Sequence, residues 1–513
     1  MTIPTDPHIK HTEASLESRL GYWNDTARST SVFPTVSGDL NVDVAIVGGG
    51  IVGITTARML KDQGLTVAVV ESQRVGRQAT GKSTAKVTSQ HGLLYQQLIK
   101  KYDQTQARRY ADAQQSGLML IRHLIEKYQI ECDLETLPAY IYTTDPAHVS
   151  ELEREATLAR QLGLPASVTN VSGLPFGVQA ALRFEGQAQI HPVNFVAQLA
   201  HTLPGDGSHV FEQSPVISWE PQSVVTTGGT ITASHVILAT QLPLGLTGGY
   251  YTKAFPHAEP VIAARVASEL DGMYLSAGSP LRSIRTHRNA QGDVYLLAAG
   301  DSFKPGETTA QRESFQALEA WISEHFGPMT VTHRWINEDF SAMDSVPFVG
   351  RSSRSGYLVA TGFSGWGFTN GAAAAIMLRD IITGTRNDWQ ALFDADRINP
   401  VAGGTTFLKE SAGVVSKLAK GYIKSSPVGS PDELAAGEAA VMQIDKKKVA
   451  AYRDETGTLH TLSAVCTHLG CVVGWNATDR TWDCPCHGSR FSLAGHVISG
   501  PAVKPLAPFK EED

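Results

Sequence analysis

The feature that most constrains this chain is a group of cysteines and histidines near its carboxyl end. Cys466 and His468 are separated by one residue and Cys484 and His487 by two, with Cys471 between the two pairs. The 513 residues contain only 5 cysteines, too few for a disulfide scaffold in a chain of this length. Thiolates and imidazoles at such short spacings are typical ligands of transition metals. The pattern therefore predicts a metal site in the last part of the chain.

A second constraint lies near the amino end, where a strand, a glycine turn, a helix and another strand follow one another. The apolar run Val42–Val47 leads into Gly48-x-Gly50-x-x-Gly53, and a second apolar run ends at Glu71. In a dinucleotide-binding βαβ unit, such glycines allow a tight turn and close approach of a pyrophosphate. The acidic residue accepts hydrogen bonds from the adenosine ribose. We therefore expect these four residues to bind a dinucleotide.

A rival nucleotide motif follows, because Gly76–Ser83 satisfies the phosphate-loop pattern G-x-x-x-x-G-K-[ST]. A working phosphate loop runs directly from a strand into a helix. Here the preceding strand has already ended near Glu71, and that residue is committed to the ribose if the first motif is functional. We therefore do not expect a nucleotide triphosphatase.

Residues 40–400 resemble the FAD-dependent oxidoreductases of the D-amino-acid oxidase-like superfamily. Beyond the glycine turn, the resemblance rests on the segments Thr80–Lys86, Ser214–Ile217, His235–Thr240 and Gly356–Thr369. It implies an α/β FAD-binding domain of Rossmann-like fold, interleaved with a substrate domain built on an antiparallel sheet. It also implies a set of FAD contacts: Thr80, Gly81, Lys82, Ser83, Thr84, Val216, Ala239, Thr240, Gly365, Trp366, Gly367, Phe368 and Thr369.

The carboxyl-terminal pattern resembles a Rieske [2Fe–2S] centre, in which two cysteines hold one iron and two histidines hold the other. The resemblance covers residues 427–513 and assigns Cys466 and Cys484 to one iron, and His468 and His487 to the other. A structural zinc site is the alternative, but it would leave two of these cysteine and histidine side chains unused. We expect an all-β domain whose cluster has a potential within roughly −150 to +300 mV.

The other cysteines refine this expectation. Rieske proteins of respiratory and photosynthetic cytochrome complexes carry a disulfide between the cluster loops, and the resemblance places it at Cys471 and Cys486. Ser489 matches a residue whose hydroxyl donates to a bridging sulfide, whereas Phe491 replaces a tyrosine that donates to a cysteine sulfur. The loss of that hydrogen bond predicts an intermediate potential. Cys132 is expected to be a buried free thiol.

Candidate substrate contacts lie between the segments assigned to FAD. We expect Arg285, as part of a strand, to bind a substrate carboxylate. Lys304, His333 and Trp335 are weaker candidates for the substrate pocket, and His91 is a candidate for facing the flavin ring. For each of these residues a packing or surface role remains an open alternative.

The order of these features predicts the domain organisation. Residues 1–40 form an amino-terminal extension, and residues 401–426 form a linker with an amphipathic helix. The other domains are assigned as follows: FAD-binding domain, residues 41–95, 185–250 and 345–400; substrate domain, residues 96–184 and 251–344; Rieske domain, residues 427–513.

Together these features predict a dehydrogenase with two redox centres. The superfamily usually oxidises a C–H bond next to a nitrogen, so we expect an amine or amino-acid substrate. FAD accepts two electrons as hydride and a Rieske cluster accepts one, so electrons should leave singly to an external carrier. No second G-x-G-x-x-G follows a strand, which argues against an NAD(P)H domain.

Three alternatives remain open. Electrons from ferredoxin or a quinol could enter at the cluster and reduce a substrate at the flavin. The chain could instead be a non-enzymatic electron carrier or redox sensor. An oxidase that releases H₂O₂ is also conceivable, but it would leave the one-electron exit without a use.

Composition argues against other classes. Lys and Arg number 43 against 50 Asp and Glu, giving a net charge of −7, and no basic stretch is interleaved with aromatics as in a nucleic-acid surface. No apolar run approaches the roughly 18 residues of a membrane-spanning helix. The amino-terminal residues show no secretory signal pattern. We expect a cytoplasmic protein with no transmembrane segment and no nucleic-acid partner.

Overall fold

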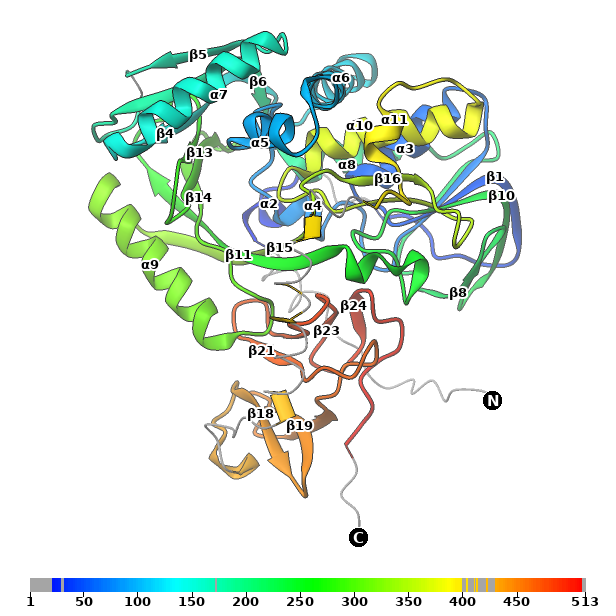
Figure 1. Cartoon of the computed structure of the whole chain (residues 1–513). Coiled ribbons are helices and arrows are strands. Elements are labelled where there is room, and N and C mark those ends of the chain that lie inside the picture. Colours follow the sequence, from blue (N-terminus) through cyan, green and yellow to red (C-terminus); the bar gives the residue numbers. More distant parts are fainter. Residues whose placement is uncertain are drawn as a thin grey trace.

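The computed structural model of the chain describes residues 21–28, 32–170, 173–398, 403–404, 410, 412–413, 421–422 and 430–509. Residues 1–20 of the predicted extension, and most of the predicted linker helix, lie outside these ranges. Within the described residues the chain forms three parts built on β-sheets, and the carboxyl-terminal part lies below the other two in Figure 1.

The first part is an eight-stranded sheet with the order β16-β17-β10-β1-β2-β7, to which β9 and β8 are added. Its central strands run parallel, with Val47 of β1 opposite both Leu238 of β10 and Val70 of β2. The three strands therefore end at one edge, where the glycine turn begins. The strands are β1 (Leu40–Val47), β2 (Val67–Val70), β7 (His209–Phe211), β8 (Val216–Glu220), β9 (Ser223–Thr226), β10 (Gly229–Leu238), β16 (Phe348–Arg351) and β17 (Leu358–Thr361).

Helices cover this sheet, as a buried parallel sheet requires. Helix α10 (Gly367–Thr383) contacts both α3 (Ile51–Lys61) and α6 (Gln104–Tyr128). Close approach depends on glycine, because a Cβ on Gly117 of α6 would lie 2.4 Å from the carbonyl oxygen of Thr369. The remaining helices of the two larger parts are α2 (Tyr22–Asp25), α4 (Ala79–Lys82), α5 (Leu94–Lys101), α7 (Val149–Gln161), α8 (Pro192–His201), α9 (Thr308–Phe326) and α11 (Gln390–Phe393).

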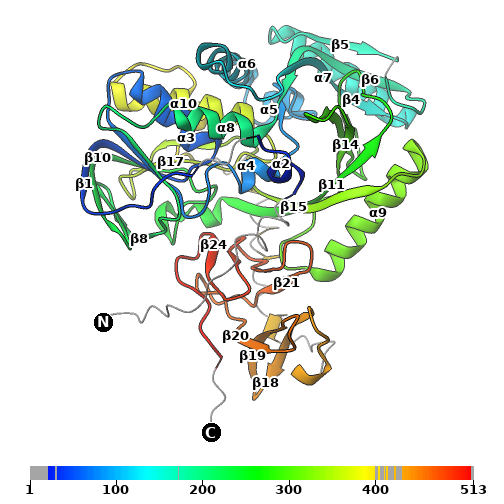
Figure 2. The same ribbon diagram turned by 180° about the vertical axis from the view of Figure 1, so that it is seen from behind.

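The second part is a nine-stranded sheet with the order β15-β11-β14-β13-β12-β4-β6-β3, to which β5 is added. All of its pairs are antiparallel except β4 with β12. The long strands β11 and β15 form a ribbon that runs under both larger parts (Figures 1 and 2). The strands are β3 (Lys86–Val87), β4 (Glu135–Thr143), β5 (Ala166–Thr169), β6 (Ala180–Gln189), β11 (Ala254–Val266), β12 (Met273–Ser276), β13 (Ser283–Arg288), β14 (Val294–Ala299) and β15 (Val331–Ala342).

The third part contains two small antiparallel sheets. The four-stranded sheet lies against the β11–β15 ribbon and the end of α9, and the three-stranded sheet lies farther away (Figures 1 and 2). A hydrophobic core of this third part is formed by Trp475, Trp482 and Phe491 together with the cysteines. The strands are β18 (Ala439–Ile444), β19 (Lys447–Arg453), β20 (Leu459–Ser463), β21 (Gly474–Asn476), β22 (Thr481–Asp483), β23 (Arg490–Phe491) and β24 (Val497–Ser499).

This architecture confirms the predicted fold class, but it differs from the expected ranges in detail. Strand β3 and the end of β6 belong to the second sheet, although residues 41–95 and 185–250 were assigned to the FAD-binding domain. Helix α2 is a further difference, because Tyr22 and Trp23 of the polar extension are completely buried. Cys132 is a buried free thiol, as predicted. Among the described residues, no helix has the length and apolar character needed to cross a bilayer.

Candidate functional site

The glycine turn lies where β1, β2 and β10 end, and its backbone leaves no room for side chains. Gly48 has a φ of +110°, and a Cβ there would lie 2.5 Å from the carbonyl oxygen of Ala239. A Cβ on Gly53 would lie 1.9 Å from the carbonyl oxygen of Gly48. Gly50 caps the amino terminus of α3, so N–H groups without a partner inside the helix, and the positive end of the helix dipole, adjoin the turn. This arrangement suits a pyrophosphate.

Glu71 is buried after β2, and its carboxylate holds the turn. One oxygen accepts the N–H of Gly49 at 2.8 Å, and the other accepts the N–H of Gln73 at 2.9 Å. Burial raises the pKa of Glu71, and these hydrogen bonds oppose the rise. The oxygen that accepts the Gln73 N–H also accepts the hydroxyl of Ser72 at 3.3 Å, whereas the oxygen that accepts the Gly49 N–H keeps a further lone pair. The predicted contact with a ribose hydroxyl therefore remains available.

A cavity of about 460 Å³ runs along this edge of the sheet. Many residues predicted to contact FAD line it: Gly48, Gly50, Glu71, Thr80, Ser83, Val216, Ala239, Thr240, Gly365, Gly367 and Phe368. The other predicted contacts do not line it: Gly53, Gly81, Lys82, Thr84, Trp366 and Thr369. Lining residues that the sequence patterns did not indicate include Arg74, Gln241, Leu244, Asn337, Asp339 and residues 496–500. The glycine turn, the helix terminus and the carboxylate fit an FAD in this cavity.

His91 is buried and does not line this cavity. Its Nδ1 lies 2.8 Å from the hydroxyl of Tyr110, and its Nε2 lies 3.0 Å from the hydroxyl of Thr369. Its ring stacks on Trp366 at 4.7 Å. Burial lowers the pKa of His91 to about 3, so the ring is neutral. These contacts support the packing role that the sequence left open.

Arg285 is completely buried and does not line this cavity. Its Nη1 donates to the carbonyl oxygens of Thr84 and Ala85 at 3.0 Å and of Ile190 at 3.2 Å. Its guanidinium lies over the ring of Trp23. The residue therefore ties the predicted flavin loop to the end of β6. This arrangement does not support the predicted contact with a substrate carboxylate.

The weaker substrate candidates lie in different surroundings. Trp335 donates its indole N–H to the carbonyl oxygen of Lys82 at 2.7 Å. His333 lies 3.2 Å from the carboxylate of Asp25. Lys304 lines a second cavity and pairs with Glu410 at 2.6 Å. Of these candidates, Lys304 lines the second cavity, and Trp335 and His333 line neither it nor the FAD cavity.

This second cavity has a volume of about 780 Å³ and is lined in part by the β11–β15 ribbon, like the first. His257 and Glu259 of β11 line the second cavity, and they stand opposite Asp339 and Asn337 of β15, which line the first. Opposed residues of an antiparallel pair project to the same face. The two cavities therefore share one face of the ribbon. Acidic side chains dominate the charged wall of the second: Glu259, Asp301, Glu307, Glu313 and Glu410, with Lys304 as the lysine among them.

The predicted cluster ligands are brought together by the loops before and after β21 and β22. Cys466 and Cys484 are buried, and their thiols are in hydrogen-bond contact. The rings of His468 and His487 lie 5.0 Å apart at an angle of 85°. Two thiols on one side and two imidazoles on the other form the donor set of a Rieske cluster. The residues present therefore fit the predicted metal centre.

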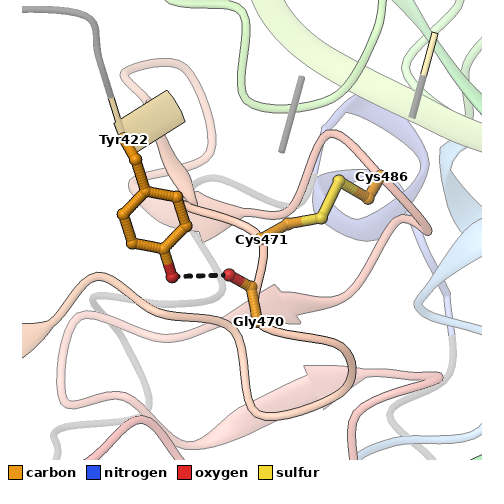
Figure 3. The surroundings of a disulfide bond; sticks show 4 residues. All are labelled: Tyr422, Gly470, Cys471 and Cys486. Carbon is orange, nitrogen blue, oxygen red and sulfur yellow. Dashed lines mark hydrogen bonds between the residues drawn. A yellow bond between two sulfur atoms is a disulfide. The ribbon is translucent and has the colours of Figure 1, made fainter. Parts of the chain in front are cut away.

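The predicted disulfide is present between Cys471 and Cys486, and it joins the two ligand loops (Figure 3). Tyr422, from the linker, donates its hydroxyl to the carbonyl oxygen of Gly470 at 3.0 Å, beside this disulfide (Figure 3). The Ser489 hydroxyl oxygen accepts the N–H of Ala502 at 3.0 Å. Its hydroxyl also donates to the sulfur of Cys466, so Ser489 lies directly beside the predicted cluster ligands.

The cluster histidines face the larger parts of the molecule. The ring of Tyr251, which follows β10, lies 5.3 Å from the ring of His468 and 5.5 Å from that of His487. Gly245, in the same segment, donates its N–H to the carbonyl oxygen of Pro501 at 2.9 Å. The segment after β10 thus contacts both the first cavity and the predicted cluster loops.

Comparison with known proteins agrees with both sites. Residues 43–381 match the family model "FAD dependent oxidoreductase", and residues 424–510 match "Rieske [2Fe-2S] domain". The chain is 32% identical to the "Putative Rieske 2Fe-2S iron-sulfur protein YhfW" of Bacillus subtilis (strain 168), over 94% of this chain and 96% of that protein. It is 23% identical to the "Gamma-glutamylputrescine oxidoreductase" of Escherichia coli (strain K12), over 76% of this chain and 95% of that protein.

Solved structures support the fold of the two larger parts. Glycine oxidase from Geobacillus kaustophilus aligns with a TM-score of 0.56 at 18% identity, covering 70% of this chain and 99% of that one. L-Proline dehydrogenase from P. horikoshii aligns with a TM-score of 0.58 at 19% identity, covering 71% and 98%. At these identities the likeness establishes the fold alone.

Proposed function

The chain belongs to the FAD dependent oxidoreductase family and ends in a Rieske [2Fe-2S] domain, and on this premise we propose that it is an amine dehydrogenase with an internal electron relay. FAD in the cavity lined by Gly48, Gly50 and Glu71 would supply acceptance of a hydride from the carbon next to a substrate nitrogen, and a cluster held by the Cys466–His468 and Cys484–His487 pairs would supply one-electron transfer. An external one-electron carrier is the final acceptor. The protein holds the two cofactors beside each other and binds the amine.

The observation that carries this proposal is the shared interface of the two cofactor sites. Tyr251 packs against both cluster histidines, and residues 496–500 of the Rieske domain line the FAD cavity. Electrons can then pass between the centres within one molecule. This arrangement supports a relay over a Rieske domain that acts independently of the flavin.

The second cavity supports a cationic amine as the substrate. Its carboxylates attract an ammonium group and repel a substrate carboxylate. Arg285, the expected carboxylate anchor, instead binds backbone carbonyls. The Escherichia coli relative is named a gamma-glutamylputrescine oxidoreductase, which agrees with an amine.

Glu259 is the side chain that we assign to accept the ammonium proton. It lies at the junction of the two cavities, opposite Asn337. Burial raises its pKa above the ordinary value, which makes the ionised carboxylate a stronger base. A neutral amine, with its lone pair free, donates hydride more readily than an ammonium ion.

Anaerobic mixing with a panel of amines, amino acids and 2-hydroxy acids tests this function. Bleaching of the flavin absorbance reports hydride transfer, and the electron paramagnetic resonance signal of the reduced cluster reports the relay. We expect cationic amines to bleach the flavin and to produce the cluster signal. If no substrate bleaches the flavin, while reduced ferredoxin fills both centres, electrons flow in the opposite direction.

A further inference from the structure

The FAD cavity has walls from two domains. Gly48, Gly50 and Glu71 form one side of it, and the Rieske segment 496–500, with Ala502, forms another. The Rieske domain therefore covers part of the cavity when it is docked as in this structure. A cofactor in the cavity would contact both domains at once.

The segment after β10 joins this cover to the FAD-binding part. Leu244 lines the cavity, and a Cβ on Gly500 would lie 3.1 Å from its side chain. The next residue, Gly245, donates its N–H to Pro501. Movement of the Rieske domain away from this segment would therefore open the cavity wall.

A buried ion pair ties the predicted flavin loop to the Rieske domain. Lys82 stands between the cavity-lining residues Thr80 and Ser83, but its ammonium lies 2.6 Å from the carboxylate of Asp479. The two side chains are only 5% and 3% exposed. A buried charge is costly without a partner, so each depends on the other across the interface. The lysine of the phosphate-loop-like motif thus binds a protein carboxylate instead of a phosphate.

Arg490 extends this pair into a network. Its guanidinium lies 2.6 Å from Asp479, 3.3 Å from Asp483 and 3.4 Å from Glu338 of the ribbon. Burial raises the pKa of Glu338 to about 8, which favours its neutral form. Two basic side chains, Lys82 and Arg490, therefore lie among the carboxyl groups of Asp479, Asp483 and Glu338. The network is balanced only while the domains are in contact.

We propose that the Rieske domain is a wall of the FAD site and that the Lys82–Asp479 pair locks it there, so that FAD binding and docking of the cluster domain are thermodynamically linked. A ligand that contacts both walls binds the docked form more tightly than the undocked form. By reciprocity, FAD strengthens docking by the same factor by which docking strengthens FAD binding. The linkage holds for either direction of electron flow.

The first test measures FAD release from the loaded Asp479→Asn protein, by the recovery of flavin fluorescence after dilution. The change removes the partner charge of Lys82 with little change in shape. We expect release to be faster than from the wild type by about tenfold or more. Asp454→Asn is the matched control, because Asp454 pairs with His460 inside the Rieske domain, away from the interface. The control should release FAD at the wild-type rate.

The second test uses wild-type protein and does not depend on the folding of a variant. The contact between Thr308 and Trp475, and that between Gln311 and Asn476, join α9 to the Rieske domain outside the FAD cavity. Amide hydrogen exchange at 306–311 and 474–476 is compared in FAD-loaded protein and in FAD-depleted protein that retains its cluster. We expect faster exchange without FAD, restored on adding FAD, and no change in β18 and β19.

Either of two results overturns the proposal. One is exchange at this remote interface that is the same with and without FAD. The other is a folded Asp479→Asn protein, with its cluster intact, that releases FAD at the wild-type rate. Each experiment measures FAD binding or domain docking directly, so neither result depends on the identity of the substrate.

Discussion

At the scale of single residues, the cluster ligands determine whether electrons can leave the flavin. Cys466→Ser removes one thiolate and keeps the side-chain volume. We expect the variant to lose the cluster absorbance and its electron paramagnetic resonance signal, and to keep FAD. Amines should still bleach the flavin, but reduction of a one-electron acceptor should cease. Full turnover with that acceptor in the variant would rule out the relay.

Glu259 separates binding of the amine from removal of its proton. In Glu259→Gln, flavin bleaching at neutral pH should slow by about 100-fold, the lower range for loss of a general base. The rate should recover at alkaline pH, where the free amine is already neutral. Stopped-flow measurement of flavin bleaching across this pH range gives the rates at neutral and at alkaline pH. A uniform loss of rate at every pH would show that Glu259 only shapes the pocket.

The raised pKa of Glu338 leads us to expect that the free energy of unfolding depends on pH. Burial raises its pKa from 4.5 to about 8, so the folded protein favours the neutral carboxyl. The contribution of Glu338 to stability is therefore present below pH 4.5 and is lost as the pH rises toward about 8, at about 1.4 kcal/mol for each unit of pKa difference. Glu338→Gln should unfold at a temperature that changes less over this range. Parallel curves for the two proteins would contradict the assignment.

The residues that sequence reasoning located are those with short-range signals. The spacing of Cys466 and His468 indicates a metal site, and the position of Glu71 after a strand indicates a contact with a ribose. Both signals can be recognised within a few residues of the sequence. Contacts across domains carry no such signal, so Tyr251 was missed and Lys82 was assigned to the cofactor. The role of Arg285 as a substrate contact stays a prediction, because a strand pattern gives the face of a residue but not its neighbour, and in the structure its Nη1 binds backbone carbonyls.

At the scale of elements, the turn between β1 and α3 depends on the absence of side chains. Gly48→Ala would place a methyl group 2.5 Å from a carbonyl oxygen in a left-handed region of the backbone. We expect a loss of about 2 kcal/mol or more of stability and of most bound FAD. The ratio of flavin to protein absorbance measures the FAD content.

Gly64→Ala is the matched control for this turn. Gly64 also has a positive φ, +82°, but nothing lies within 4 Å of a Cβ there. The control should lose about 1 kcal/mol and keep its FAD. Equal FAD loss in the two variants would mean that backbone strain, and not close approach at the cavity, is responsible.

At the scale of the whole molecule, the order of the sequence motifs was sufficient to predict three sheet-based parts and their fold classes. It was not sufficient to place them, because docking depends on contacts such as the Lys82–Asp479 ion pair and the hydrogen bond from Gly245 to the Pro501 carbonyl, whose partners no sequence motif specifies. The structure brings the Rieske domain under the β11–β15 ribbon and against the FAD cavity. The two redox sites therefore share one interface.

The central claim is that electrons pass from the flavin to the cluster within one molecule. The most direct measurement is rapid freezing after anaerobic mixing of the loaded protein with an amine that bleaches it. Flavin absorbance and the cluster's electron paramagnetic resonance signal are followed together at several protein concentrations. We predict that the cluster signal appears after flavin bleaching begins, at a rate independent of protein concentration. A bleached flavin with a cluster that stays oxidised, or a rate that rises with protein concentration, would contradict the account.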